Sequence, residues 1–148
     1  MKVLMVCLGN ICRSPLAQGI LESKVSTFDV FVDSAGTSGY HEGSLPDTRS
    51  IAVAEKHGID ITNQRSRKFS ATDFDEFDII YAMDTSNYSN ILKLARNTED
   101  KYKVKMILDE LPTSDIKNVP DPYYGGAKGF DNVYAMLATA CEVIATKL

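Results

Sequence analysis

Short, wholly apolar runs alternate with helical patterns along this chain of 148 residues. Because such runs lack a polar face, the strands they predict are buried on both sides, which is typical of a parallel sheet covered by helices. Right-handed crossovers between the strands then produce a doubly wound α/β fold, and the length fits a single domain over residues 1–148. The expected strands cover residues 2–6, 30–33, 78–83 and 104–108, and the expected helices cover residues 15–24, 48–57, 86–95 and 130–147.

Charge and cysteine content exclude several classes of protein. The net charge of −4 and the lack of a basic block argue against nucleic-acid binding. The first apolar run is too short for a signal peptide or a membrane span, so we expect no membrane insertion. Three cysteines without an export signal predict reduced thiols in the cytoplasm. The two histidines, His41 and His57, have no ligand spacing with the cysteines, so we expect no metal site.

The segment from Val6 to Pro15 joins the first expected strand to the first expected helix. Cys7 closes the strand, and Arg13 stands six residues later at the helix entrance. Ser14 suits the N-cap and Pro15 the first helical position. A short loop before a helix N-terminus points several backbone N–H groups at one spot, where the helix dipole adds positive potential. The segment therefore predicts a site for a tetrahedral oxyanion.

The same loop also carries reactive groups. A thiolate at Cys7 would be stabilised by the helix N-terminus and by the neighbouring arginine. Arg13 can hold two phosphate oxygens at once, which a lysine cannot do. A lone cysteine at a strand end is usually only a small buried residue. Here the local context favours function, and the loop predicts phosphoryl transfer through a cysteine.

A thiolate that attacks phosphorus needs an acid to protonate a poor leaving oxygen. The best candidate is Asp121, which lies between two prolines and is followed by the flexible pair Gly125-Gly126. Taken alone, this segment reads as a turn. Tyr123 and Tyr124 are adjacent and cannot both lie on one buried helix face, so at least one is expected to line a cleft. An aromatic wall would suit an aryl substrate.

Taken together, the two segments resemble the low-molecular-weight protein tyrosine phosphatases. The resemblance rests on the loop from Cys7 to Pro15 and on the later run from Asp121 to Gly125, and it covers essentially the whole chain. It includes residues 33–37 and 82–84 as well. The resemblance implies a four-stranded parallel sheet with helices on both faces, no cofactor, and proteins containing phosphotyrosine as substrates.

The resemblance also implies roles for individual residues. Cys7 corresponds to the nucleophile, Arg13 to the transition-state clamp and Asp121 to the general acid and later the base. The rest of the phosphate-binding loop comprises Leu8, Gly9, Asn10, Ile11, Cys12 and Ser14.

Other positions correspond to supporting residues. Asn10 corresponds to the residue that holds the loop in shape, and Ser14 to a hydroxyl that assists thiolate departure. Ser34 corresponds to a hydroxyl that buttresses the loop, and Tyr40 to an aromatic residue at the cleft mouth. Gln64 falls where many members carry a histidine, which is a departure from the family pattern.

Three other functions remain open. Protein arginine phosphatases carry threonine at the position of Ile11, and isoleucine favours tyrosine. Thioredoxin-coupled arsenate reductases need two further cysteines close together downstream, whereas only Cys141 stands there, at an apolar helix position typical of core packing. A non-catalytic phosphate-binding module would not need Cys7, Arg13 and Asp121 together. A nucleotide P-loop is excluded because no Gly-Lys-Ser/Thr follows the loop.

Cys12 lies five positions after Cys7 in the same tight loop, so the two sulfurs are expected to approach within disulfide range. Peroxide would oxidise an accessible, low-pKa thiol first to a sulfenic acid. Cys12 could then resolve it as a disulfide. The alternative is that Cys12 only packs beneath the loop.

Overall fold

The computed structural model describes residues 1–112 and 115–148, and its centre is one parallel sheet of four strands. The strand order is β2-β1-β3-β4, and every neighbouring pair is parallel. The strands are β1 (Lys2–Cys7), β2 (Phe31–Gly36), β3 (Ile79–Ala82) and β4 (Val104–Met106). The chain runs from β1 outward to β2 and then returns to β3 on the other side of β1. The strand order therefore reverses at β1, and ligands of such sheets bind beyond the carboxyl ends of the strands at this point.

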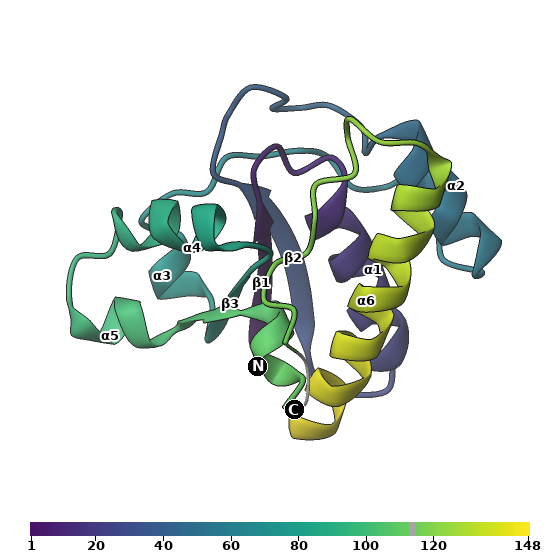
Figure 1. Ribbon diagram of the computed structural model, residues 1–148. Helices are drawn as coiled ribbons and strands as arrows, with labels where there is room; N and C mark the ends of the chain where they lie inside the picture. The colour runs from purple at the N-terminus through teal and green to yellow at the C-terminus, as the bar shows by residue number, and fades with distance from the viewer. Residues whose placement is uncertain (113–114) are drawn as a thin grey trace.

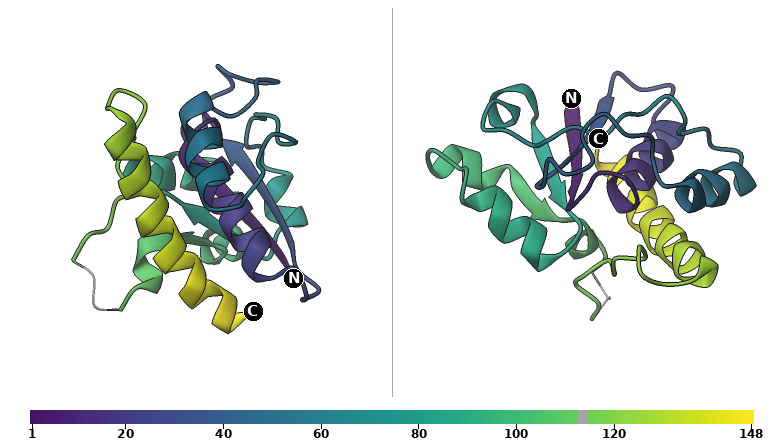
Figure 2. Two further views of the ribbon diagram at one scale, coloured as in Figure 1. Left: turned by 90° about the vertical axis from the view of Figure 1, so that its right-hand side faces the viewer. Right: turned by 90° about the horizontal axis from the view of Figure 1, so that it is seen from above.

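Helices lie on both sides of the sheet, as Figures 1 and 2 show. One layer contains α1 (Arg13–Lys24), α2 (Thr48–Lys56) and α6 (Ala127–Lys147). The other contains α3 (Asp73–Glu76), α4 (Thr85–Leu92) and α5 (Thr98–Tyr102), and a 3₁₀ turn, η1 (Ile107–Glu110), follows β4. This arrangement confirms the predicted doubly wound α/β fold.

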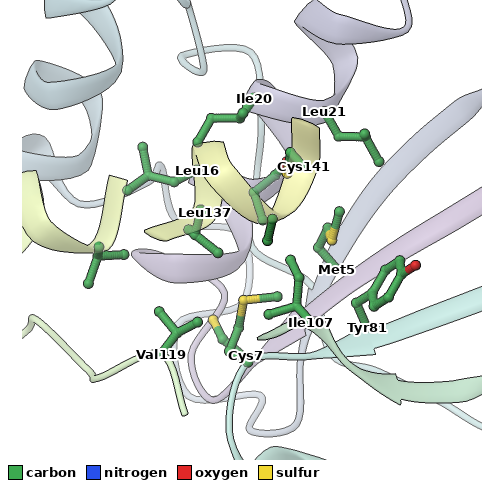
Figure 3. Packing of buried hydrophobic residues seen from close by; sticks show 14 of the residues in the cluster. Met5, Cys7, Leu16, Ile20, Leu21, Tyr81, Ile107, Val119, Leu137 and Cys141 are labelled. Carbon is green, nitrogen blue, oxygen red and sulfur yellow. The ribbon is translucent and has the colours of Figure 1, made fainter. Parts of the chain in front are cut away.

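The side chains of β1 alternate between two hydrophobic clusters. Val3, Met5 and Cys7 pack on the side of α1 and α6, whereas Leu4 and Val6 pack with the aromatic side chains near α3. Figure 3 shows the first cluster, to which both Cys7 and Val119 belong. One apolar face of α6, made by Val133, Leu137, Ala140 and Ile144, is buried in this cluster. Cys7 is thus anchored by the core on the strand that ends at the reversal point.

Two predicted boundaries around the loop were wrong. α1 begins at Arg13, so Pro15 is its third residue rather than its first. Ser14 is not the N-cap, since Cys12 occupies that position without a side-chain cap and the Ser14 hydroxyl contacts Cys7 instead. β2 extends to Gly36, beyond the predicted end at residue 33, because its last residues pair with β1 in register up to Cys7.

The later boundaries differ by up to three residues, and the expected helix 86–95 is α4, which ends at Leu92. The expected helix 48–57 is α2, which ends at Lys56, and Gly58 follows it with a φ of +76°. The expected strand 104–108 is divided into β4 and η1, and α6 begins at Ala127 rather than at residue 130. The short helices α3 and α5 were not predicted, because four or five residues carry no measurable apolar period. Within residues 1–112 and 115–148, no helix is both long and apolar enough to cross a membrane.

Candidate active site

The Cys7 side chain lies at the base of the loop between β1 and α1, where it is 2% exposed. The backbone N–H of Asn10 donates a hydrogen bond to Cys7 Sγ at 3.3 Å. The hydroxyl oxygen of Ser14 lies 3.0 Å from the same sulfur. The sulfur therefore accepts one backbone hydrogen bond and lies within hydrogen-bond distance of one hydroxyl group.

The carbonyl groups of the loop point away from the sulfur. Thr37 N–H donates to Cys7 O and Ser38 N–H to Leu8 O, both at 2.9 Å. Ser66 Oγ donates to Gly9 O at 3.0 Å. In a planar trans peptide the N–H points opposite to the C=O, so the following N–H groups point toward the interior of the loop. Inward N–H groups of this kind suit the binding of an anion.

Gly36, the last residue of β2, makes the loop's close approach to the sheet possible. A Cβ atom at this position would lie 2.7 Å from Leu8 O and 3.1 Å from the backbone nitrogen of Asn10. Any larger residue would therefore push against the loop backbone.

Asn10 connects the loop to its surroundings. It is buried and has a φ of +56°, a left-handed conformation that asparagine adopts more readily than most residues. Its Nδ2 group donates to Ser14 Oγ at 2.8 Å and to Ser34 Oγ at 2.9 Å. Its Oδ1 atom accepts from the backbone N–H of Arg67 at 3.0 Å.

These bonds determine the direction of the hydroxyl protons. Both protons of the Asn10 amide are used, so Ser34 is left to donate to Gln18 Oε1 at 2.7 Å. Ser14 can direct its proton either at Cys7 Sγ, 3.0 Å away, or at Ala35 O, 3.5 Å away. The predicted supporting residues Asn10, Ser14 and Ser34 are therefore in contact behind the pocket. Gln64 comes from the chain after α2 and contacts α1, where its Nε2 group donates to Pro15 O at 3.1 Å.

Arg13 is held by groups from two other parts of the chain. Its Nη1 group donates to Asp84 Oδ2 at 2.6 Å and to Val119 O at 3.0 Å. Nη2 lies 3.7 Å from Asp121 Oδ2. Burial alone would lower the pKa of Arg13, but the nearby negative charges outweigh that effect and raise it. The guanidinium thus stays charged although its side chain is only 3% exposed.

Asp84 is a site residue that sequence reasoning missed. It follows β3 and caps α4 by accepting from the backbone N–H of Asn87 through Oδ1, while Oδ2 accepts from Arg13. The available sequence signal was a carboxylate between an expected strand and an expected helix. The carboxyl ends of parallel strands meet at one edge of the sheet, so a residue in that position lies near the site.

An open pocket of about 410 Å³ lies over Cys7. It brings together the predicted nucleophile, clamp and acid with the three tyrosines predicted for the cleft, although Tyr40 and Tyr124 are largely exposed at its rim. Its lining comprises Cys7, Leu8, Gly9, Ile11, Cys12, Arg13, Ser38, Tyr40, His41, Asp121, Tyr123 and Tyr124.

His41 was considered in the sequence only as a metal ligand, yet it lies in this pocket wall. Its ring meets Tyr40 edge-on with centroids 4.8 Å apart, and it lies 6.4 Å from the ring of Tyr123. Its position directly after Tyr40 was the available signal. Among the described residues, no group of three or more His, Cys, Asp or Glu side chains is arranged to hold a metal ion.

The two other cysteines differ from Cys7 in their surroundings. Burial raises the pKa of Cys12 to about 12, and the negative charges of Asp47 and Cys7 add to the effect. Burial also raises the pKa of Cys141 to about 12. Cys141 is fully buried in the core against α1, as predicted. Both side chains are therefore neutral thiols near pH 7.

Comparisons with known proteins agree with this geometry. Residues 2–148 match a family described as low molecular weight phosphotyrosine protein phosphatase. A Schizosaccharomyces pombe protein with that name is 42% identical over 142 residues, which cover 92% of this chain and 89% of that protein. A crystal structure of a protein tyrosine phosphatase from Entamoeba histolytica superimposes with a TM-score of 0.93 at 40% identity, covering 99% and 96% of the two chains. The Drosophila arginine phosphatase superimposes with a TM-score of 0.92 at 34% identity, covering 99% and 97%.

Proposed function

Since the chain belongs to the low molecular weight phosphotyrosine protein phosphatase family, we propose that it hydrolyses phosphotyrosine in proteins through a cysteinyl-phosphate intermediate. The observation that carries this proposal is the pocket in which Cys7, Arg13 and Asp121 meet beneath aromatic side chains. We further propose that residues 1–148 act as one catalytic domain.

The first step is an in-line attack of the Cys7 thiolate on phosphorus. A sulfur–phosphorus bond forms as the bond between phosphorus and the tyrosine oxygen breaks. The protonated carboxyl of Asp121 donates its proton to the leaving phenolate. Tyr123 and Tyr40 flank the pocket, where they can contact the aromatic ring of the substrate.

The second step hydrolyses the intermediate. The Asp121 carboxylate takes a proton from a water molecule, whose oxygen attacks phosphorus as the sulfur–phosphorus bond breaks. The Ser14 hydroxyl, 3.0 Å from Cys7 Sγ, donates a hydrogen bond to the departing thiolate. Inorganic phosphate is released, and the enzyme returns to its starting state.

In both steps negative charge spreads over the three equatorial phosphoryl oxygens. The inward N–H groups of the loop and the Arg13 guanidinium are placed to stabilise this charge without rearrangement, and such stabilisation is usually the largest catalytic contribution. A phosphoryl group that binds Arg13 would compete with Asp121, which lies 3.7 Å from Nη2. That competition would release the carboxyl group toward the leaving oxygen.

The test is hydrolysis of p-nitrophenyl phosphate and of phosphotyrosine peptides by the wild type and by Cys7→Ser. The wild type should hydrolyse both. The serine variant should lose turnover yet keep its affinity for inorganic phosphate, because the anion site consists of backbone N–H groups and Arg13. Substantial activity in the serine variant would disprove the covalent mechanism.

Arginine phosphatase activity is a second candidate, because the Drosophila arginine phosphatase has nearly the same fold. Ile11 lines the pocket, where its apolar side chain suits an aryl group better than a guanidinium. We therefore favour phosphotyrosine over phosphoarginine. Faster hydrolysis of phosphoarginine than of phosphotyrosine peptides by the wild type would reverse this preference.

We also propose that the site is sensitive to peroxide. Peroxide would convert the Cys7 thiolate to a sulfenic acid, and the Cys12 thiol would displace its hydroxyl as water to form a disulfide. Cys12 is protonated at neutral pH, which supports Cys7 as the thiol that is oxidised first. A nucleophilic thiol works only while reduced, and this supports a place in the cytoplasm.

A further inference from the structure

Arg49 links the start of α2 to the segment that carries Asp121. Its Nη2 group donates to Tyr123 O at 3.0 Å, and its Nη1 group donates to Gly125 O at 3.2 Å. The guanidinium also lies over the rings of Tyr123 and Phe130, at 5.6 and 4.6 Å from their centroids. One side chain therefore holds two carbonyl groups and one ring of this segment.

The guanidinium of Arg49 is itself fixed by Asp47, the N-cap of α2. Asp47 Oδ1 accepts from Arg49 Nε at 3.0 Å and from its backbone N–H at 2.8 Å, and Oδ2 accepts from Nη2 at 3.0 Å. Hydrogen bonds from Arg49 hold the pKa of Asp47 below its ordinary value, so the carboxylate is charged at neutral pH. This leaves Arg49 little rotational freedom.

The same turn of α2 is bound to the nucleophile loop. The backbone N–H of Asp47 donates to Ile11 O at 2.8 Å, and Ser50 Oγ donates to Cys12 O at 3.3 Å. The start of α2 therefore contacts the loop of the nucleophile on one side and the segment of the acid on the other. It lies between two parts of the site that are more than 100 residues apart in sequence.

The segment that carries Asp121, residues 120–126, has features that make a support useful for catalysis. The Asp121 side chain is 37% exposed, and the pair Gly125-Gly126 gives the backbone after it wide conformational freedom. General acid catalysis requires the proton donor to lie within hydrogen-bond distance of the leaving oxygen. A displacement of about 1 Å can reduce the rate on the order of 10²-fold.

We propose that Arg49 is a positioning residue that sets the place of Asp121 relative to the phosphoryl group on Cys7. It acts by holding the carbonyls of Tyr123 and Gly125 against the start of α2. The inference deepens the proposed phosphatase mechanism and rests on it. Arg49 is not among the residues that line the pocket over Cys7, so its effect should appear only where the proton from Asp121 matters.

The test compares Arg49→Met with the control Lys56→Met. Lys56 also lies on α2, but its ammonium group donates to Asp131 of α6 at 2.7 Å rather than to the segment that carries Asp121. The readout is kcat/KM over a series of aryl phosphates whose leaving phenols differ in basicity, together with the inhibition constant of inorganic phosphate.

For Arg49→Met, kcat/KM on phenyl phosphate should fall ~10- to 100-fold, whereas the loss on dinitrophenyl phosphate, whose leaving group needs no proton, should stay below ~3-fold. Phosphate affinity should not change. Arg49→Lys should recover part of the loss, because lysine can still donate to one carbonyl. Lys56→Met should behave as the wild type throughout.

Hydrogen–deuterium exchange provides a second measurement that does not depend on activity. Deuterium uptake by residues 120–126 should be faster in Arg49→Met than in the wild type and unchanged in Lys56→Met. If Arg49→Met does not fold, Asp47→Asn keeps a good N-cap but removes the charge that fixes Arg49, and it should show a smaller change of the same kind.

Equal losses for all leaving groups, or unchanged uptake in residues 120–126, would overturn the role of Arg49. Wild-type protein that hydrolyses no aryl phosphate would instead overturn the proposed function. In that case the exchange measurement still decides whether Arg49 holds the segment.

Discussion

Replacing Asn10 with alanine is expected to weaken both the stability of the protein and the anion site. Asn10 is buried, has a φ of +56°, and makes three hydrogen bonds through its side-chain amide. Alanine removes all three bonds. It leaves Ser14 and Ser34 without the donor that directs their own protons, and it leaves the backbone N–H of Arg67 without its acceptor.

The magnitude follows from these contacts. Each lost hydrogen bond costs ~1 kcal/mol in the free energy of unfolding, or ~3 kcal/mol for the three. The left-handed conformation costs alanine ~1 kcal/mol more. The sum of ~4 kcal/mol is a large part of the ~5–15 kcal/mol that stabilises a typical domain, and it corresponds to a fall in Tm on the order of 10 °C at this chain length.

Urea denaturation measures the free energy of unfolding, and competitive inhibition by inorganic phosphate measures the anion site. Asn10→Gly is the control, because glycine loses the same bonds but adopts the left-handed conformation freely. It should be less destabilised than Asn10→Ala by roughly 0.5–1 kcal/mol, after allowance for the greater entropy of glycine in the unfolded chain. Both variants should bind phosphate more weakly and react more slowly with iodoacetamide at Cys7.

A loss of less than ~1 kcal/mol in Asn10→Ala, with phosphate affinity unchanged, would refute this reasoning. It would mean that the loop keeps its shape through its backbone contacts alone. A large loss of stability with normal phosphate affinity would separate the two roles, and it would refute the claim that Asn10 shapes the anion site.

Three further changes test other parts of the site. Asp121→Asn should lower kcat/KM ~10²–10⁴-fold on phosphotyrosine but less on p-nitrophenyl phosphate, and equal losses would exclude Asp121 as the acid. Cys12→Ser should keep most of its activity but recover poorly in dithiothreitol after peroxide, whereas wild-type protein recovers; equal recovery, or no Cys7–Cys12 crosslink by mass spectrometry, would leave Cys12 with a packing role only. Gly36→Ala should destabilise the protein by ~1–3 kcal/mol and weaken phosphate binding, because its Cβ would lie 2.7 Å from Leu8 O; normal phosphate affinity would show that the loop yields without cost.

The layered fold was predictable because each strand and each longer helix has its own pattern of apolar residues in the sequence. The apolar runs of β1 and β3 have no polar face, which indicates burial on both sides, and the helical stretches between them leave few other architectures. The same local rules misplaced the start of α1. Serine is a preferred residue type at the N-cap. The Ser14 hydroxyl instead lies against Cys7 and accepts a hydrogen bond from Asn10, and these contacts override the preference.

Residues outside the nucleophile loop were harder to place. Asp121 could be named because it stands in a distinctive turn between two prolines, and its distance from Arg13 was not available from the sequence. Asp84 and Arg49 carried no signal strong enough to be assigned a role. Each has an ordinary local explanation, as a helix cap and as a residue in a first helical turn.

The sequence by itself determined the α/β class, the loop from Cys7 to Arg13 and its anion-binding chemistry. The strand, the short loop and the helix are contiguous in the chain, so their residues lie close together independently of the rest of the fold. Only the tertiary structure decided that Asp84, Asp121 and Arg49 surround this loop. They come from separate segments, which converge because parallel strands end at one edge of the sheet and α2 packs against α1 and α6. The distances that turn a reactive cysteine into a candidate catalyst are therefore a property of the assembled layers.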